Sequence, residues 1–189
     1  SIFSSRNQNE ESKQIFTETL FAAIVFSILF VILGLFFTGP IARLLGADSE
    51  TYEMTVTYIR ILFLFAPAFI MNNILNSFVR NDGNPKNAML AMLIGSLANI
   101  VFDYIFIFPF KLGIFGAALA TGTAPLIGIG ILSIHIFSKN SSLRCKKSLP
   151  RPKEITFTLS LGLPSLIAEV ASGVVMIVFN QLILGLDGN

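Results

Sequence analysis

The sequence predicts an all-α, polytopic membrane protein, a bundle of about five transmembrane helices. Of its 189 residues, 53% are hydrophobic and only 13% are charged, whereas a soluble domain averages about 25% charged residues. Five apolar stretches are each long enough to cross the bilayer hydrocarbon, which takes about 20 residues. The mean hydropathy of +0.75 agrees with this class.

Charges and turn residues set the limits of the five spans. The first span carries no charge between Thr19 and Ala42, and Thr38-Gly39-Pro40 marks its exit. The polar residues before it, 1–16, are expected to form a loop that leads into the helix. The predicted spans are 17–42, 58–79, 88–110, 112–137 and 155–186, and a basic loop occupies 138–154.

The second span carries a polar face. Asn72, Asn76 and Arg80 are spaced four residues apart and therefore lie on one side of the helix. Buried amides inside a membrane need partners, so this face is expected to point toward other helices or toward water. Hydrogen bonds between helices and the lining of a substrate cavity both explain it, and both stay open at this point.

The third and fourth spans form an antiparallel hairpin, because only a short turn separates them. Asp103, Asn99 and Ser96 share one face of the third span. With a rise of about 1.5 Å per residue, Asp103 lies about 10 Å and Asn99 about 16 Å below Phe110. Thr121 of the fourth span reaches about 13 Å, between the two. Their oxygens are therefore expected to meet at one level inside the membrane.

An acid inside a bilayer helix marks a functional site by default, because it costs about 2.5 to 3.5 kcal/mol at the helix centre. A carboxylate, an amide and a hydroxyl at one level predict a site for Na⁺ or a proton, formed by Asp103, Asn99 and Thr121. The alternative is that Asn99 and Thr121 only hydrogen-bond across the hairpin while Asp103 faces a water-filled cavity.

The fifth span carries a second intramembrane acid. Glu169 lies near its middle, and no Lys or Arg lies in the core of any span to pair with it. We therefore predict an ion- or proton-coupling role for Glu169 as well. A possible substrate cavity is assigned to Asn72, Asn76, Ser96 and Asn180.

The distribution of the 13 Lys and Arg residues predicts the orientation of the chain. Ten of them fall on the side of the chain start, six of these within the basic loop 138–154, and three fall on the opposite side. By the positive-inside rule the start is cytoplasmic. A basic loop between spans is far more often an orientation signal than a nucleic-acid site, so no nucleic-acid partner is expected.

Several motifs, in order, resemble the multidrug and toxic compound extrusion (MATE) family of bacterial efflux antiporters, over essentially the whole chain. These motifs are Phe78 to Lys86, Ser96-Leu97-Ala98-Asn99 through Asp103-Tyr104, Gly113 to Thr121, and Gly162-Leu163-Pro164 with Glu169. The resemblance implies a twelve-helix transporter of two lobes in a bacterial inner membrane. It makes this chain a fragment covering helices three to seven, with 1–137 in the first lobe, 138–154 as the inter-lobe loop, and 155–189 as the first helix of the second lobe.

The resemblance also implies roles for the polar residues. Asn99, Asp103 and Thr121 match by spacing three members of an ion site in the first lobe, and Glu169 is similar to a membrane glutamate that other members use. The first-lobe site further requires an aspartate on helix one, and the Glu169 site requires partners on later helices. None of these partners lies in the chain.

The predicted function is secondary active efflux of cationic, amphipathic drugs by antiport with Na⁺ or H⁺, without a further cofactor. The drug is expected to compete with the ion for one acid-lined cavity. The partners are the lipid bilayer, the drugs, the coupling ion and the remaining helices of the full-length transporter. The alternatives are a flippase for lipid-linked precursors of the same superfamily and an inactive membrane fragment. An enzyme is not expected, because no HExxH, GxSxG, Walker-type loop or Cys/His cluster occurs.

Overall fold

The computed structural model describes the backbone of residues 2–138, 141–143 and 152–187, and the side chains of 12–138, 141–143, 162–164, 166–179 and 182. All regular secondary structure in these residues is helical, which confirms the predicted fold class. The helices are α1 (Ile2–Phe36), α2 (Thr38–Leu44), α3 (Tyr52–Leu64), α4 (Ala66–Asn81), α5 (Pro85–Ile107), α6 (Gly113–Ile136) and α7 (Pro152–Asp187).

Several helices are long enough to span a membrane. Four helical stretches within the described residues are long and apolar enough to cross a bilayer, and the pair α3 and α4 adds a fifth if it is counted as one bent span. The four stretches are Ser12–Phe36, Pro85–Ile107, Gly113–Ile136 and Gly162–Phe179. Their exposed surface is rich in Leu, Ile, Val and Phe, as a surface that faces lipid requires.

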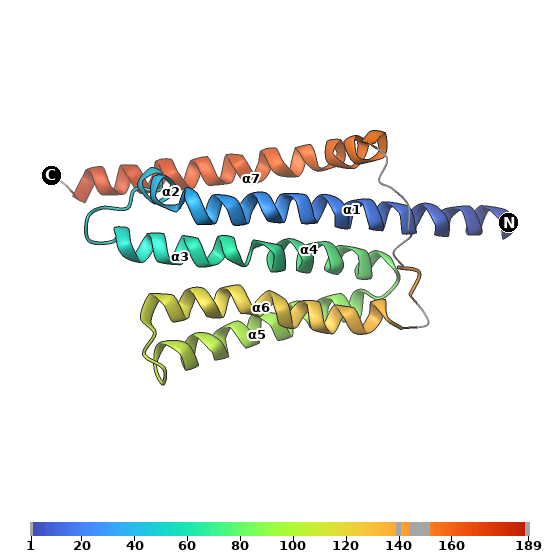
Figure 1. The fold of residues 1–189 in the computed structure, drawn as a ribbon, viewed down its shortest axis with the longest axis horizontal. Coiled ribbons are helices and arrows are strands. Elements are labelled where there is room, and N and C mark those ends of the chain that lie inside the picture. The colour runs from blue at the N-terminus through green and yellow to red at the C-terminus, as the bar shows by residue number, and fades with distance from the viewer. Residues whose placement is uncertain (1, 139–140, 144–151, 188–189) are drawn as a thin grey trace.

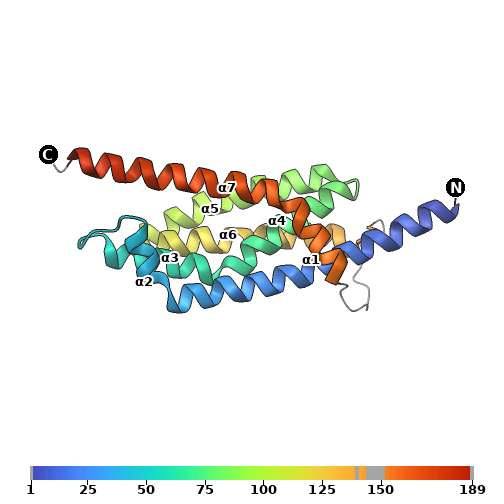
Figure 2. The same ribbon diagram turned by 90° about the horizontal axis from the view of Figure 1, so that it is seen from above.

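The helices run side by side along one long axis, as Figures 1 and 2 show. In Figure 1, α3 and α4 lie between α1 on one side and the pair α5 and α6 on the other. α6 packs against α3, α4 and α5, whereas α7 packs only against α1 in the described part of the chain. We call the two ends of the bundle the Asp82 end, which holds the α4–α5 turn, and the Asp48 end, which holds α2 and the turn before α3.

The first helix begins earlier than predicted. The prediction of a loop over 1–16 is wrong, because α1 already begins at Ile2. Glu, Gln, Lys and Arg favour helix, and no Gly or Pro occurs before Gly34, so no residue type in this stretch interrupts the helix.

The first span then breaks near the Asp48 end instead of continuing over 17–42. α1 ends at Phe36, and α2 starts after Phe37. Pro40 explains the break, because its ring would clash with the carbonyl group of Phe36 four residues earlier.

The second span is longer than the predicted 58–79 and is bent. The helix already starts at Tyr52, and α3 and α4 meet at Phe65 with an angle of 48° between them. Pro67 causes the bend, because it lacks an N–H and its ring crowds the carbonyl group of Phe63. The prediction of one straight span does not take this proline into account.

α6 approaches its neighbours closely because its buried side consists largely of small residues. At Gly122, for example, a Cβ would lie 2.5 Å from the ring of Phe65. Gly130, elsewhere on the same helix, would meet nothing within 4 Å. Small residues at helix contacts let two backbones approach within a membrane. The buried small residues of α6 are Gly116, Ala118, Ala120, Gly122, Ala124 and Gly128.

The turn between α4 and α5 follows directly from its sequence. Gly83 has a φ of 83°, a backbone conformation that favours glycine after a helix end. Asn84 caps α5, since its side chain accepts a hydrogen bond from the N–H of Asn87 over 3.2 Å. Pro85 occupies the first position of α5, where its missing N–H costs nothing. Asp82 is therefore held at a defined point between the two helices.

Candidate functional site

A polar cavity of about 710 Å³ lies between α4, α5 and α6. Its wall combines apolar side chains with amides and hydroxyls from all three helices. Five sequence-predicted residues share this cavity, three from the predicted substrate cavity and two from the predicted coupling site. The polar lining residues are Asn72, Asn73, Asn76, Ser77 and Arg80 of α4, Ser96 and Asn99 of α5, and Thr121 of α6.

Two contacts with neighbouring helices hold the α4 wall of the cavity. Asn76 Nδ2 donates a hydrogen bond to the backbone carbonyl of Ala88 on α5 over 2.9 Å. Asn72 lies against Gly128 of α6, where a Cβ would collide with the Asn72 Oδ1 atom. The missing side chain at Gly128 thus makes room for the amide of Asn72.

Asn99 and Thr121 lie at the same level of the α5–α6 hairpin. Asn99 lies eight residues before Ile107, the end of α5, and Thr121 lies eight residues after Gly113, the start of α6. Both residues therefore lie about 12 Å from the hairpin end. They do not hydrogen-bond to each other among the described residues, and Asn99 Nδ2 is buried there without a partner. The two side chains therefore share the cavity wall rather than only tying the hairpin together.

Asp103 does not line this cavity. It is half-buried on α5, one turn from Asn99 and only about 6 Å from the helix end at Ile107. The predicted depth is too large, because α5 ends at Ile107 and not at residue 110. Asp103 lies closer to the Asp48 end of the bundle than Asn99 does.

Glu169 and Asn180 lie on α7 and apart from the cavity residues. Glu169 is exposed, and α7 packs only against α1 among the described helices. Asn180 belongs to α7, but its side chain lies outside the described residues. The roles of both residues stay predictions.

A further acid inside a span was not among the predicted site residues. Glu18 of α1 is only 2% exposed, and its Oε1 atom accepts a hydrogen bond from Gln14 Nε2 over 3.2 Å. The predicted span 17–42 includes Glu18, but no role is predicted for this acid from the sequence.

The cavity is built to hydrogen-bond a polar ligand or water, because amides and hydroxyls both donate and accept. Arg80 is the charged residue among its described lining residues. The expectation of an acid-lined cavity is therefore not met in the described part of the chain. Hard cations take about six or more oxygen ligands, so Asn99 and Thr121 do not by themselves form a complete cation site.

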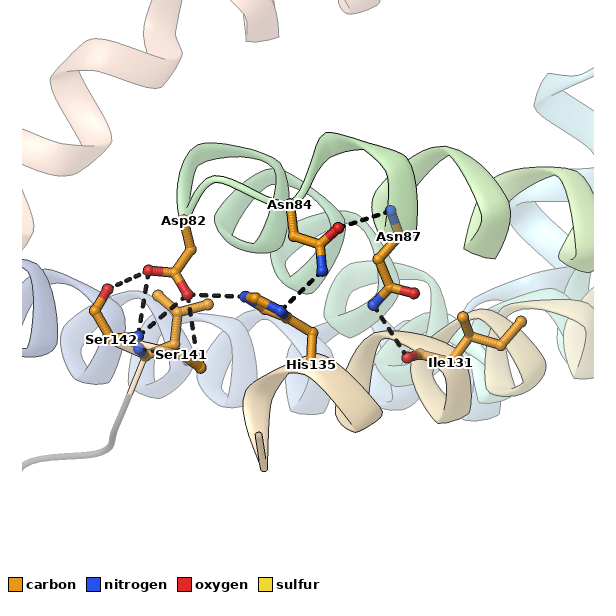
Figure 3. A network of polar contacts seen from close by, with 8 residues as sticks. Asp82, Asn84, Asn87, Ile131, His135, Ser141 and Ser142 are labelled. Carbon is orange, nitrogen blue, oxygen red and sulfur yellow. Dashed lines mark hydrogen bonds and ion pairs between the residues drawn. The ribbon is translucent and has the colours of Figure 1, made fainter. Parts of the chain in front are cut away.

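A second polar cluster, centred on Asp82, lies at the Asp82 end of the bundle (Figure 3). His135 Nε2 lies 2.9 Å and Ser141 Oγ 3.1 Å from Asp82 Oδ2, and Ser142 donates to the same carboxylate through its N–H and its hydroxyl. On the other side of the imidazole, Asn84 Nδ2 lies 3.1 Å from His135 Nδ1. The side chains of Asp82 and His135 are each only 8% exposed.

The pKa of Asp82 lies below the ordinary aspartate value. Burial is the largest single influence and would raise the pKa, but hydrogen bonds from Ser142, His135 and Ser141 together outweigh it. Asp82 is therefore held as a carboxylate that accepts hydrogen bonds. The polar turn at Asp82 and the late His135 are both visible in the sequence, but they are 53 residues apart and only the fold pairs them.

Helices of membrane-spanning length that together line a polar cavity are typical of an integral membrane protein such as a transporter or a channel. The chain belongs to the MatE family, whose sequence model matches residues 4–105, more than half of the chain. This membership confirms the resemblance that the sequence motifs indicate.

Relatives of the chain include two bacterial export proteins. Multidrug export protein MepA of Staphylococcus saprophyticus is 31% identical over 177 residues, which cover 93% of this chain and 39% of that protein. Multidrug export protein MepA of Staphylococcus aureus is 32% identical over 173 residues, which cover 90% of this chain and 38% of that protein. The chain thus spans about two fifths of the length of the curated relatives it matches.

A solved structure has the same fold. It is described as the inward-facing conformation of a multidrug resistance MATE family transporter of the MOP superfamily. It matches with a TM-score of 0.83 at 25% identity, and the match covers 93% of this chain and 40% of that one.

Proposed function

We propose that the chain forms part of a multidrug efflux transporter in a bacterial membrane. Its membership of the MatE family and its similarity to multidrug export proteins support this function. The polar cavity between α4, α5 and α6 is the observation that carries the proposal. Amides and hydroxyls cost free energy inside a membrane bundle unless they hydrogen-bond a ligand, water or one another, so their concentration in one cavity favours a path for polar or amphipathic molecules.

Export is proposed to be driven by inward movement of Na⁺ or H⁺. Asp103 and Glu169 are the candidate coupling residues, because each is an acid within a membrane-spanning stretch. Binding at either acid drives a conformational change only if the two states of the transporter bind the ion with different affinity. The positive-inside distribution of Lys and Arg supports a cytoplasmic chain start and, with it, a cytoplasmic Asp82 end.

Ethidium efflux from bacteria that express the full-length parent protein tests this function. The variants are Asp103→Asn and Glu169→Gln, and Asp48→Asn is the control, because it makes the same type of substitution in an exposed turn. Each is measured with and without Na⁺ and at two pH values. At equal expression we expect the wild type and the control to expel ethidium and at least one of the other variants to lose efflux.

The possible outcomes separate the parts of the proposal. Wild-type efflux in an Asp103→Asn, Glu169→Gln double variant contradicts the coupling role of both acids. Efflux that depends on Na⁺ but not on pH identifies Na⁺ as the coupling ion, and the reverse identifies H⁺. No efflux from the wild type contradicts drug export and favours the lipid flippase or an inactive fragment.

A further inference from the structure

The Asp82 cluster joins three parts of the chain that are distant in the sequence (Figure 3). Asp82 lies in the α4–α5 turn, His135 lies in the last turn of α6, and Ser141 and Ser142 follow α6 on the way to α7. All three partners donate to one carboxylate. The cluster therefore ties the ends of α4, α5 and α6 to the connection that leads to α7.

Asn84 fixes the direction of the hydrogen bonds in this cluster. Its Oδ1 atom accepts the backbone N–H of Asn87, a bond that only the oxygen of the amide can make, so its Nδ2 atom faces the imidazole. Because a side-chain NH₂ group only donates, His135 Nδ1 is the acceptor and Nε2 carries the proton that is donated to Asp82. Asn84, His135 and Asp82 thus form a chain of hydrogen bonds with one defined direction.

Apolar packing holds the same connection from the other side. Leu143 is 4% exposed and belongs to the core cluster at this end, together with Phe16, Leu75, Val79 and Leu132. The low exposure of Asp82 and His135 keeps water from competing strongly for their hydrogen bonds. Residues 141–143 are therefore anchored both by the carboxylate and by the apolar core.

The cluster lies beside one end of the candidate cavity. The helices that line the cavity are α4, α5 and α6, whose ends at this side of the bundle are the ones that the cluster joins. Arg80, which lines the cavity, comes two residues before Asp82, and the cavity residue Asn76 bonds to Ala88 in the first turn of α5. A change in the spacing of these helix ends would therefore change the shape of the cavity.

We propose that Asp82 is a positioning residue for transport. Its cluster holds residues 141–143 against the ends of α4, α5 and α6, and we call this set of contacts the clamp. The clamp thereby sets the width of the cavity at the Asp82 end. Asp82 acts through the helices and does not touch the substrate. This role rests on the proposed function, but the clamp is a structural property that is measured without transport.

Spin labels on the full-length protein test the clamp directly. Lys86→Cys on α5 and Ser138→Cys after α6 place labels in the wall of a cavity of about 570 Å³ that Asp82 and His135 also line, and Cys145→Ser removes the native thiol. Pulsed electron paramagnetic resonance in lipid nanodiscs then gives the distribution of distances between the two labels. We expect one narrow distribution in the otherwise unchanged protein and a broadened, longer one after Asp82→Asn.

Two further variants make this result specific. Asp48→Asn is the matched control, because the Asp48 carboxylate also accepts hydrogen bonds, and in the described residues these come from Glu50 and Thr51 of its own turn at the opposite end. It should leave the distribution unchanged. A Ser141→Ala, Ser142→Ala double variant keeps the carboxylate and should broaden the distribution, so the test remains decisive if Asp82→Asn fails to fold. A narrow distribution in the serine double variant overturns the clamp.

Transport kinetics in proteoliposomes test the positioning role. Asp82→Asn should raise the KM for ethidium several-fold and change the maximal rate little, whereas Asp48→Asn should change neither. A fall in the maximal rate at an unchanged KM overturns the positioning role. If the wild type does not transport ethidium, the proposed function fails, and with it the role in transport, while the spin-label distances still decide whether the clamp exists.

Discussion

Asp82 shows how opposing influences on one residue decide its charge. Removal from water penalises the carboxylate, but three side chains that donate to it compensate for this loss. The result is a buried carboxylate whose pKa lies below the ordinary value. A group of this kind links the stability of the fold to pH.

We expect Asp82→Asn to lower the thermal unfolding midpoint of the full-length protein near neutral pH and to have less effect in acid. Because the native pKa of Asp82 is depressed, its stabilising contribution is complete above the ordinary aspartate pKa of about 3.9 and is lost as the pH falls through the lower native value. Scanning fluorimetry of both proteins in detergent over a series of pH values measures the difference. Glu53→Gln, an exposed acid on α3, is the control. A difference that grows toward acid contradicts this prediction.

At the scale of single elements, the close packing of α6 requires glycine at particular positions. Gly122→Ala should destabilise the protein by about 1–3 kcal/mol, because the added methyl group would overlap the ring of Phe65. Gly130→Ala is the matched control, since the same change on the same helix meets no neighbour and improves helix propensity by about 1 kcal/mol. Thermal unfolding midpoints of the two purified variants give the comparison, and equal midpoints would contradict the tight contact.

The start of α5 offers a second test of an element. Asn84→Ala removes the side-chain acceptor that caps the helix and should cost about 0.5–2 kcal/mol. Asn84→Ser retains a capping oxygen and should therefore be the more stable of the two variants, although both lose the amide that donates to His135. The thermal unfolding midpoints of the two purified variants test this difference in stability. A serine variant no more stable than the alanine variant argues against the cap.

At the scale of the whole molecule, the two sides of α5 differ, because one side lines the polar cavity and the other carries exposed apolar side chains. Ser96 lines the polar cavity, whereas its neighbour Leu97 is 61% exposed on the outer surface. Maleimides react with the thiolate, which needs water to form. In the full-length protein without Cys145, Ser96→Cys should therefore react with a polar maleimide, and Leu97→Cys should not. Equal labelling of the two positions in intact membranes would contradict a water-filled cavity.

The approximate places of the spans could be read from the sequence because they depend on local composition. Lipid excludes charge, so long apolar stretches mark the spans whatever their neighbours are. The bend at Phe65 was also readable, from Pro67, because a proline acts on its own helix. The common level of Asn99 and Thr121 was predictable for a related reason, since a short hairpin fixes the register of its two helices.

The positions of Asp103 and Glu169 show where inference from the local sequence fails. Asp103 and Asn99 share a helical face, yet only Asn99 lines the cavity, because four residues move a side chain about 6 Å along the axis and the cavity has limited length. Glu169 is exposed on α7, away from the cavity residues. Spacing along a helix reports the direction of a side chain, whereas the extent of a cavity depends on every helix around it.

The sequence by itself determined the membrane class, the approximate places of the spans, the polar faces and the family, because each follows from residues that lie near one another in the chain. The tertiary structure decided which faces meet. It joined Asn72 and Asn76 to Ser96, Asn99 and Thr121 in one cavity, and it set His135 against Asp82 across 53 residues of sequence. Packing decides such pairings because their free energy depends on burial and hydrogen bonding between helices, and neither exists until the helices are assembled.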